Sequence, residues 1–254
     1  MNQSIHKMLD ETGGMARFAS RFFKELFKPR FEFSEFLNQC YFVGYMSIAL
    51  VAITGFIMGL VITIQSRPTL VEFGAEAWLP KMVSVSLIRE IVPVVTALIC
   101  AGKIGSGIGA ELGSMKVTEQ IDAMEVSGTN PYKYLVVTRV LATTFMIPLL
   151  VIFSCGVALY GGYLGANLQN TVSWSLWWNQ VFESLKFRDV LPALLKTFFF
   201  GFAIGIVGCY MGFTTQKGTQ GVGQSANSAV VIASLLVFIL DLIAVQITDL
   251  LGLT

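Results

Sequence analysis

Residues 42–64 read FVGYMSIALVAITGFIMGLVITI and contain no charged side chain. Because a helix rises about 1.5 Å per residue, this segment is long enough to cross the roughly 30 Å hydrocarbon core of a bilayer. Of the 254 residues in the chain, 54% are hydrophobic and 13% are charged, whereas a typical soluble domain has about 25% charged residues. The sequence therefore predicts an all-α integral membrane protein.

Further apolar stretches extend this prediction to about five transmembrane helices. They lie at about 83–101, 140–162, 194–215 and 229–248. Trp174, Trp177 and Trp178 follow the third of the five spans, and such tryptophans are typical of a segment at the membrane interface. We expect one transmembrane domain over residues 41–254, preceded by an N-terminal region of residues 1–40.

Residues 15–28, MARFASRFFKELFK, have the pattern of an amphipathic helix. One face is basic and another is apolar, and the residues that show this are Arg17, Arg21, Lys24 and Lys28 against Phe18, Phe22 and Leu26. Such a helix suits the headgroup level of a bilayer. A soluble helix that packs on a partner protein would show the same pattern.

The basic residues also indicate how the spans are oriented. Lysine and arginine concentrate in residues 1–41 and 102–139, whereas the segments on the opposite side hold only Arg67, Lys81, Lys186 and Arg188. By the positive-inside rule, this distribution puts the N-terminus in the cytoplasm. Five spans then put the C-terminus on the outer side.

Four charged residues fall within or at the edge of the spans, and they are Arg89, Glu90, Lys196 and Asp241. A charge near the bilayer centre costs about 2.5–3.5 kcal/mol on insertion scales, so such residues usually pair or line a polar cavity. We expect pairs between helices, with Glu90–Lys196 and Arg89–Asp241 as the first candidates. They could form a polar lock that shifts during transport or static links between helices, and the sequence leaves both readings open.

The fourth span carries glycines at helical spacing, namely Gly201, Gly205, Gly208 and Gly212. Small residues four positions apart let helix backbones approach closely in a membrane, where water does not drive packing. The spacing predicts a tightly packed bundle. It does not distinguish contact within one chain from contact between two chains.

The loop between the second and third spans, residues 101–131, reads AGKIGSGIGAELGSMKVTEQIDAMEVSGTNP. A glycine-rich start is followed by a helix-compatible run, and Gly128 and Pro131 then act as stop signals. Acidic residues recur on one face of this run. An amphipathic helix with an acidic face suits docking into a groove on a partner protein, although a simply solvated face would look the same.

The chain lacks the groups that bind nucleotides or metals. No G-x-x-x-x-G-K-[ST] loop is present, and the glycine cluster Gly218, Gly221 and Gly223 is followed by no lysine. The four cysteines have no metal-ligand spacing, and the single histidine, His6, cannot form a metal site alone. The net charge of +1 gives no strong field that would attract nucleic acid. We expect no cofactor in this chain.

The segment AELGSMKVTEQIDAMEVSGTNPYKYLVVTRVLA, residues 110–142, resembles the signature of the MlaE-type permeases. These are the membrane subunits of ABC systems that work with MCE-domain proteins. The segment GTQGVGQSANSAVV, residues 218–231, is similar to the last inner loop of that family. The likeness extends over roughly residues 36–250.

The resemblance implies a multi-pass permease of the bacterial inner membrane that forms a homodimer around a lipid-binding cavity. Its partners would be a cytoplasmic ABC ATPase, which would bind ATP and Mg²⁺, and a periplasmic MCE-domain protein. Its substrate would be a phospholipid, and the system would serve outer-membrane lipid transport and asymmetry. The resemblance makes residues 111–125 the coupling helix, which would present Glu111, Leu112, Met115, Glu119, Asp122 and Glu125 to the ATPase. It also equates Arg89, Glu90, Lys196 and Asp241 with the family's intramembrane charge pairs.

Other classes of membrane protein fit the sequence less well. An ion-coupled secondary transporter would have inverted repeats and paired broken helices, and we find neither in the sequence. An intramembrane enzyme would need a nucleophile and a base, or metal ligands, at membrane depth. A non-transporting scaffold would keep its structure and partners when Arg89 and Glu90 are neutralised together, and would show no lipid phenotype.

Overall fold

The computed structural model describes residues 2–29, 31–168, 172–216 and 218–252, with side chains from Thr12 onward. The described part of the chain is built from helices and contains no strand. Segments long and apolar enough to cross a membrane are found at Phe33–Glu72, Glu76–Val117, Tyr132–Asn167, Phe187–Phe213 and Thr219–Leu250. The predicted all-α fold with five transmembrane spans is therefore confirmed. The side chain of His6 lies outside the described residues.

The chain divides into two compact units, each made from three separate stretches. Unit 1 comprises Met1–Val43, Cys100–Met146 and Gly201–Leu236, and unit 2 comprises Gly44–Ile99, Ile147–Phe200 and Val237–Thr254. Three long helices are divided between the two units, and they are α8 (Thr138–Asn167), α10 (Phe187–Phe213) and α11 (Thr219–Leu250). The short helix α5 (Val92–Cys100) adds only its last residue, Cys100, to unit 1. The boundary expected between residues 40 and 41 stays a prediction.

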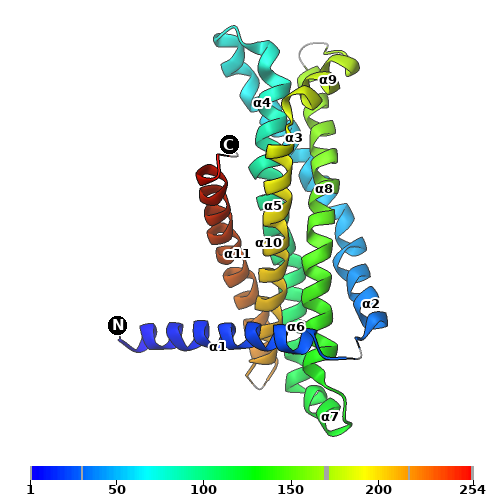
Figure 1. Cartoon of the computed structure of the whole chain (residues 1–254), viewed down its shortest axis with the longest axis vertical. Coiled ribbons are helices and arrows are strands. Elements are labelled where there is room, and N and C mark those ends of the chain that lie inside the picture. Colours follow the sequence, from blue (N-terminus) through cyan, green and yellow to red (C-terminus); the bar gives the residue numbers. More distant parts are fainter. Residues whose placement is uncertain (1, 30, 169–171, 217, 253–254) are drawn as a thin grey trace. The chain divides into compact units, whose positions relative to one another are not determined.

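Unit 1 contains the N-terminal helix and the segment predicted to couple to a partner. Its further elements are α1 (Asn2–Leu26), α2 (Phe33–Val43), η4 (Ala101–Gly105), α6 (Ser106–Val117), α7 (Gln120–Val126) and η5 (Tyr132–Val137). Helix α1 runs crosswise to α10 (Figure 1) and includes most of the amphipathic stretch expected at residues 15–28. The ring of Phe18 packs against Tyr132 and Tyr210, with centroids 4.9 and 5.6 Å apart. The apolar face of α1 is therefore covered by η5 and α10.

Hydrogen bonds fasten the end of α1 to the chain just after α7. Lys133 Nζ donates to the carbonyl oxygens of Lys28 (2.5 Å) and Pro29 (2.7 Å). These carbonyls follow the end of α1, where backbone acceptors lack helical partners. Glu25 accepts hydrogen bonds from Lys28 (2.6 Å) and Asn130 (2.9 Å). The hydrogen bond from Lys28 is the main cause that lowers the pKa of Glu25 below its ordinary value.

The glycines of α10 lie where the helix meets its neighbours in unit 1. A Cβ atom at Gly201 would lie 2.5 Å from the carbonyl oxygen of Thr143 in α8, and one at Gly212 would lie 2.5 Å from Cβ of Leu112 in α6. A Cβ atom at Gly205 would overlap the hydroxyl oxygen of Thr143 in α8, and one at Gly208 would lie 3.1 Å from the carbonyl oxygen of Gly105 in η4. Only glycine permits these approaches. In this structure the four glycines pack helices of the same chain.

The expectation of one continuous helix over residues 111–125 is wrong, because the chain forms two helices there. The coupling role of this segment stays a prediction. Helix α6 ends at Val117 and α7 begins at Gln120. Between them Glu119 adopts a left-handed conformation with φ of 59°, which interrupts the hydrogen bonds of a right-handed helix. Lys116 Nζ and Asp122 Oδ1, 2.8 Å apart, form an ion pair across this break.

Unit 2 has a core around the fully buried Trp177, which packs with apolar residues of α4 and α8 such as Val83 and Leu159. The further elements of this unit are η1 (Tyr45–Ser47), α3 (Ile48–Glu72), η2 (Glu76–Trp78), α4 (Leu79–Ser86), η3 (Leu87–Ile91), α5 (Val92–Cys100) and α9 (Trp174–Ser184). Helices α4 and α9 lie together at one end of the unit (Figure 1). A Cβ atom at Gly59 would overlap the carbonyl oxygen of Ala158, so α3 and α8 touch backbone to backbone.

Candidate functional site

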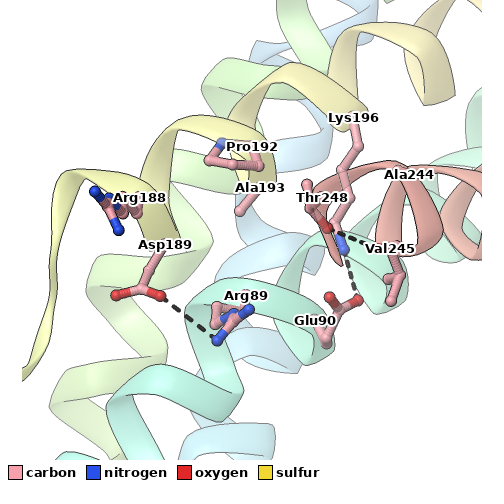
Figure 2. Close-up of a pocket in the computed structure, with 10 residues that line it drawn as sticks. All are labelled: Arg89, Glu90, Arg188, Asp189, Pro192, Ala193, Lys196, Ala244, Val245 and Thr248. Atoms are coloured by element: carbon pink, nitrogen blue, oxygen red, sulfur yellow. Dashed lines mark hydrogen bonds and ion pairs between the residues drawn. The ribbon is translucent and has the colours of Figure 1, made fainter. Parts of the chain in front are cut away.

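Arg89 and Glu90 lie in a π-helical segment, η3, between α4 and α5 of the second span. Short π segments inside helices often mark functional sites. From this one segment Arg89 reaches toward Asp189 and Glu90 reaches toward Lys196 (Figure 2). The interruption therefore places two adjacent charges against two different positions of α10.

Lys196 joins three elements of unit 2 through one ammonium group. Its Nζ donates to Oε2 of Glu90 on η3 (2.6 Å) and to Oδ1 of Asp241 on α11 (2.8 Å). The side chain of Lys196 is only 5% exposed, and a buried charge needs such partners to offset its desolvation. The contact between Glu90 and Lys196 is the one expected from the sequence. Asp241 adds a second carboxylate to it.

The pair expected between Arg89 and Asp241 is wrong, because Arg89 faces Asp189 instead. Arg89 Nη1 lies 3.5 Å from Asp189 Oδ1. Asp189 lies in the first turn of α10, where its Oδ2 accepts the backbone N–H of Lys186 at 3.0 Å. Sequence reasoning missed Asp189 because it started this span near residue 194. An acidic residue one turn before an apolar run is a signal for a helix start that could have found it.

The charged cluster adjoins an apolar groove between α10 and α11, which we call the α10–α11 groove. The groove has a volume of about 430 Å³ and is lined by Leu191, Pro192, Leu195, Lys196, Phe199, Leu240, Ile243, Ala244, Ile247, Thr248 and Leu251. Lys196 also lines the small polar pocket that Arg89, Glu90, Arg188 and Asp189 surround (Figure 2). The arrangement offers charged groups at one wall and apolar side chains along the rest. Its chemistry suits an amphiphilic molecule.

Among the residues that the structure describes, no three His, Cys, Asp or Glu side chains are placed to hold a metal ion. The cations and carboxylates of the cluster pair with each other instead. The charged groups can therefore hold helices together or meet a polar headgroup.

The residues expected on the coupling helix divide into buried and exposed sets. Leu112 is fully buried in unit 1, so its side chain is not on the surface of this chain, and its place in the coupling segment stays a prediction. Glu111 pairs with the buried Arg139 of α8, with Oε1 and Nη2 2.7 Å apart. Met115 is half-buried, whereas Glu111, Glu119, Asp122 and Glu125 are exposed. Of these four, Glu111 is the one held in the ion pair with Arg139. The surface open to a partner is therefore the α6–α7 break and α7.

The sequence profile of the family described as Permease MlaE matches residues 36–247, from α2 to near the end of α11. The chain belongs to the MlaE permease family. The matched residues include the α6–α7 segment, the charged cluster and the α10–α11 groove except for Thr248 and Leu251.

Similar proteins carry related names. A probable ABC transporter permease protein of Rickettsia typhi is 37% identical over 233 residues, which cover 92% of this chain and 90% of that protein. A probable ABC transporter permease protein of Synechocystis is 39% identical over 203 residues, or 80% and 77% of the two chains. The intermembrane phospholipid transport system permease protein MlaE of Haemophilus influenzae is 33% identical over 222 residues, or 86% and 84%. The likeness to these MlaE permease family members spans most of each chain.

Proposed function

We propose that this chain is the membrane subunit of a phospholipid transporter that obtains its energy from a separate ABC ATPase. The observation that carries the proposal is the α10–α11 groove, whose apolar walls end at the buried cation Lys196. Transferring acyl chains between water and an apolar site changes the free energy by about 0.8 kcal/mol per CH₂. A groove of this kind can hold acyl chain while the charged cluster meets the headgroup. The name of the Haemophilus influenzae relative supports phospholipid as the substrate class.

The ATPase would dock on the surface formed by α7 and the break before it. This surface carries the exposed acidic residues Glu119, Asp122 and Glu125, and a short acidic helix suits a basic groove. ATP and Mg²⁺ would be bound by that partner, since this chain has no phosphate-binding loop. The names of the Rickettsia and Synechocystis relatives support an ABC system.

The remaining features of the proposal come from the family resemblance. The chain would form a homodimer in the bacterial inner membrane and pass lipid to or from a periplasmic MCE-domain protein, in the service of outer-membrane lipid asymmetry. Its N-terminus would lie in the cytoplasm and its C-terminus in the periplasm, in line with the distribution of basic residues. Helix α1 would then lie at the cytoplasmic membrane surface, as its amphipathic pattern favours.

A matched pair of substitutions on α11 tests the groove. Ile243→Trp fills the α10–α11 groove, whereas Ile239→Trp changes a similarly exposed isoleucine one turn earlier that does not line it. Each variant would be reconstituted with its ATPase and MCE partners in vesicles that contain a fluorescent phospholipid. We expect ATP-dependent lipid transfer to be lost with Ile243→Trp and kept with Ile239→Trp. Equal transfer by the two variants would argue against the groove as the lipid site.

Purification from the native host in mild detergent tests the partners. A co-eluting ATPase, an MCE-domain protein and bound phospholipid are expected, and substitution of Glu119, Asp122 and Glu125 by lysine should release the ATPase while the fold is kept. A chain that elutes with neither ATPase nor lipid, even after cross-linking in the membrane, would favour the secondary-transporter or scaffold alternative.

A further inference from the structure

A cavity in unit 1 lies between α2 and the η4–α6 segment, and we call it the α2–α6 cavity. It has a volume of about 240 Å³, and its apolar walls include Phe42 and Val43 of α2 and Ile104 and Ile108 on the other side. None of its lining residues belongs to the α10–α11 groove or to the charged pocket beside that groove. Most small-molecule pockets measure about 300–1,000 Å³, so this cavity suits one part of a larger ligand.

Two accessible side chains of opposite charge line the α2–α6 cavity. Lys103 of η4 is exposed, and the side chain of Glu111 of α6 is 53% exposed. The two residues lie about two helical turns apart, or about 12 Å along a helix axis. Gly107 lies midway between them, and a Cβ atom there would meet nothing within 4 Å. A molecule that lies over Gly107 therefore has a cation on one side and a carboxylate on the other.

The carboxylate of Glu111 is held in place from the protein side. Arg139 of α8 is buried, and its Nη2 lies 2.7 Å from Oε1 of Glu111. A carboxylate has two oxygens and about four acceptor positions, so this ion pair fixes Glu111 and leaves it able to accept from a ligand. On the α2 wall, Gln39 donates to Glu35 at 2.8 Å. Together with Lys103, these groups comprise two cations and two carboxylates, and this balance of charge favours a zwitterion over an ion of either sign.

The two charges follow the order found in a zwitterionic phospholipid headgroup. Lys103 comes directly after the apolar stretch at about 83–101 in the second span, and Glu111 comes about two turns later. Going outward from the hydrocarbon core, the cation is therefore met first and the carboxylate second. A zwitterionic phospholipid carries its phosphate next to the glycerol and its amine further out, so each of its charges would meet the opposite charge of the protein.

We propose that the α2–α6 cavity binds the headgroup of phosphatidylethanolamine, with the phosphate at Lys103 and the ammonium group at Glu111. An ammonium group donates charge-assisted hydrogen bonds to a carboxylate, whereas the quaternary amine of choline has no N–H bond and is recognised by cages of aromatic rings. Phe42 is the single aromatic side chain among the described residues that line the cavity, so a choline cage is not formed there. This lipid site is separate from the α10–α11 groove and does not depend on transport.

Native mass spectrometry of the full-length chain in detergent tests the site by titration with phosphatidylethanolamine. Gly107→Leu fills the open middle of the cavity. Gly102→Leu is the matched control, because a Cβ atom at Gly102 also meets nothing within 4 Å and this residue does not line the cavity. Leucine is a better helix former than glycine, so both variants should fold. We expect Gly107→Leu to lose one bound phosphatidylethanolamine and Gly102→Leu to keep it, and equal binding by the two variants would overturn the proposal.

Charge variants test which part of the headgroup each residue meets. Lys103→Gln removes a charge-assisted hydrogen bond and should weaken binding at least about tenfold. Lys24→Gln, at an exposed position of α1 that does not line the cavity, should leave binding unchanged. Glu111→Gln should abolish the preference for phosphatidylethanolamine over phosphatidylcholine. Because this change leaves the buried Arg139 without its ionic partner, Lys103→Gln decides the matter if Glu111→Gln does not fold, and unchanged binding by Lys103→Gln would contradict the site.

Lipids with the same acyl chains test the headgroup. Phosphatidylethanolamine should bind more tightly than phosphatidylcholine, which lacks N–H donors, and than phosphatidylglycerol, which lacks the amine, and equal binding of the three would overturn the proposal. Phosphoethanolamine has no acyl chains and should not displace the lipid at equal concentration, so displacement would refute a lipid as the ligand. Ile243→Trp, which fills the α10–α11 groove, should keep the lipid that Gly107→Leu loses. The measurement needs no ATPase, so failure of transport and failure of this site give different results.

Discussion

Lys196 Nζ lies 2.8 Å from Oδ1 of Asp241, so that an ion pair joins α10 to α11 at the charged wall of the α10–α11 groove. The same ammonium group holds Glu90 of η3 at 2.6 Å. Movement of α11 away from α10 would widen the groove and separate Lys196 from Asp241. A role of these charges in gating, rather than only in linking helices, stays a prediction.

Removal of the shared cation should destabilise unit 2 more than removal of one carboxylate. Lys196→Met leaves both Glu90 and Asp241 without their partner, which should lower the free energy of unfolding by about 3–5 kcal/mol. Asp241→Asn leaves the Lys196–Glu90 pair in place and should cost less. Thermal unfolding in detergent measures both variants.

A neutral triple variant separates gating from assembly. Glu90→Gln, Lys196→Met and Asp241→Asn together leave no unpaired charge and should restore much of the stability lost in Lys196→Met. If the cluster only links helices, lipid transfer should recover as well. Recovered stability without transfer would support a gate.

Close packing of α3 on α8 should make Gly59 intolerant of even a methyl group. Gly59→Ala places Cβ on the carbonyl oxygen of Ala158, and overpacking of this kind typically costs about 1–3 kcal/mol. The melting temperature in detergent should fall. Gly156→Ala is the control, because a Cβ atom there meets nothing within 4 Å, and alanine is a better helix former than glycine. A similar loss in both variants would contradict the backbone contact.

The break between α6 and α7 should be relieved by glycine. Glu119 is held at φ of 59°, where an L-residue costs about 1–2 kcal/mol relative to the right-handed conformation. Glu119→Gly should therefore raise the free energy of unfolding by about 1 kcal/mol. Glu125→Gly, at an exposed position inside α7, should lower the free energy of unfolding by about 0.5–1 kcal/mol. Chemical unfolding measures the change in the free energy of unfolding for each variant. A decrease in both variants would show that Glu119 is not strained.

Attachment of α1 should weaken in acid. The pKa of Glu25 is lowered in the folded chain from its ordinary value of 4.5, chiefly by the hydrogen bond from Lys28. The ionised carboxylate therefore stabilises the folded state above pH 4.5, and this contribution is lost as the pH falls through the lowered pKa. Hydrogen exchange of the α1 amides, corrected for intrinsic rates, should show that their protection decreases as the pH is lowered below 4.5. Glu25→Gln should remove that part of the pH dependence, and an unchanged profile in this variant would refute the assignment.

The sequence predicts the spans and the amphipathic helix because both depend on the local order of apolar and charged residues. The uncharged residues 42–64 lie mostly in α3, and the spacing of Phe18 and Phe22 matches the face of α1 that packs on other helices. The close contacts of Gly201 and Gly212 likewise follow from small-residue spacing. The helix that each glycine contacts cannot be predicted from this spacing, because it depends on the tertiary arrangement.

The charge partners could be predicted only in part. Glu90 meets Lys196 as expected, but Arg89 meets Asp189, since α10 begins about two turns before the expected span. Leu112 is buried although it neighbours acidic residues, because α6 packs against Gly212 of α10. The break at Glu119 was missed because its spacing fits a continuous helix, and only the backbone conformation reveals the interruption.

The fastening of α1 to η5 also sets an order of events during synthesis. Tyr132 donates its hydroxyl hydrogen bond to the carbonyl of Phe18, 114 positions earlier in the chain. A ribosome adds roughly 5–20 residues per second, so α1 is made roughly 6–23 s before the segment that receives it. During that interval the surface that η5 supplies is absent, and the amphipathic pattern of α1 suits the membrane surface. Helix α1 therefore reaches its final place only after η5 has been made.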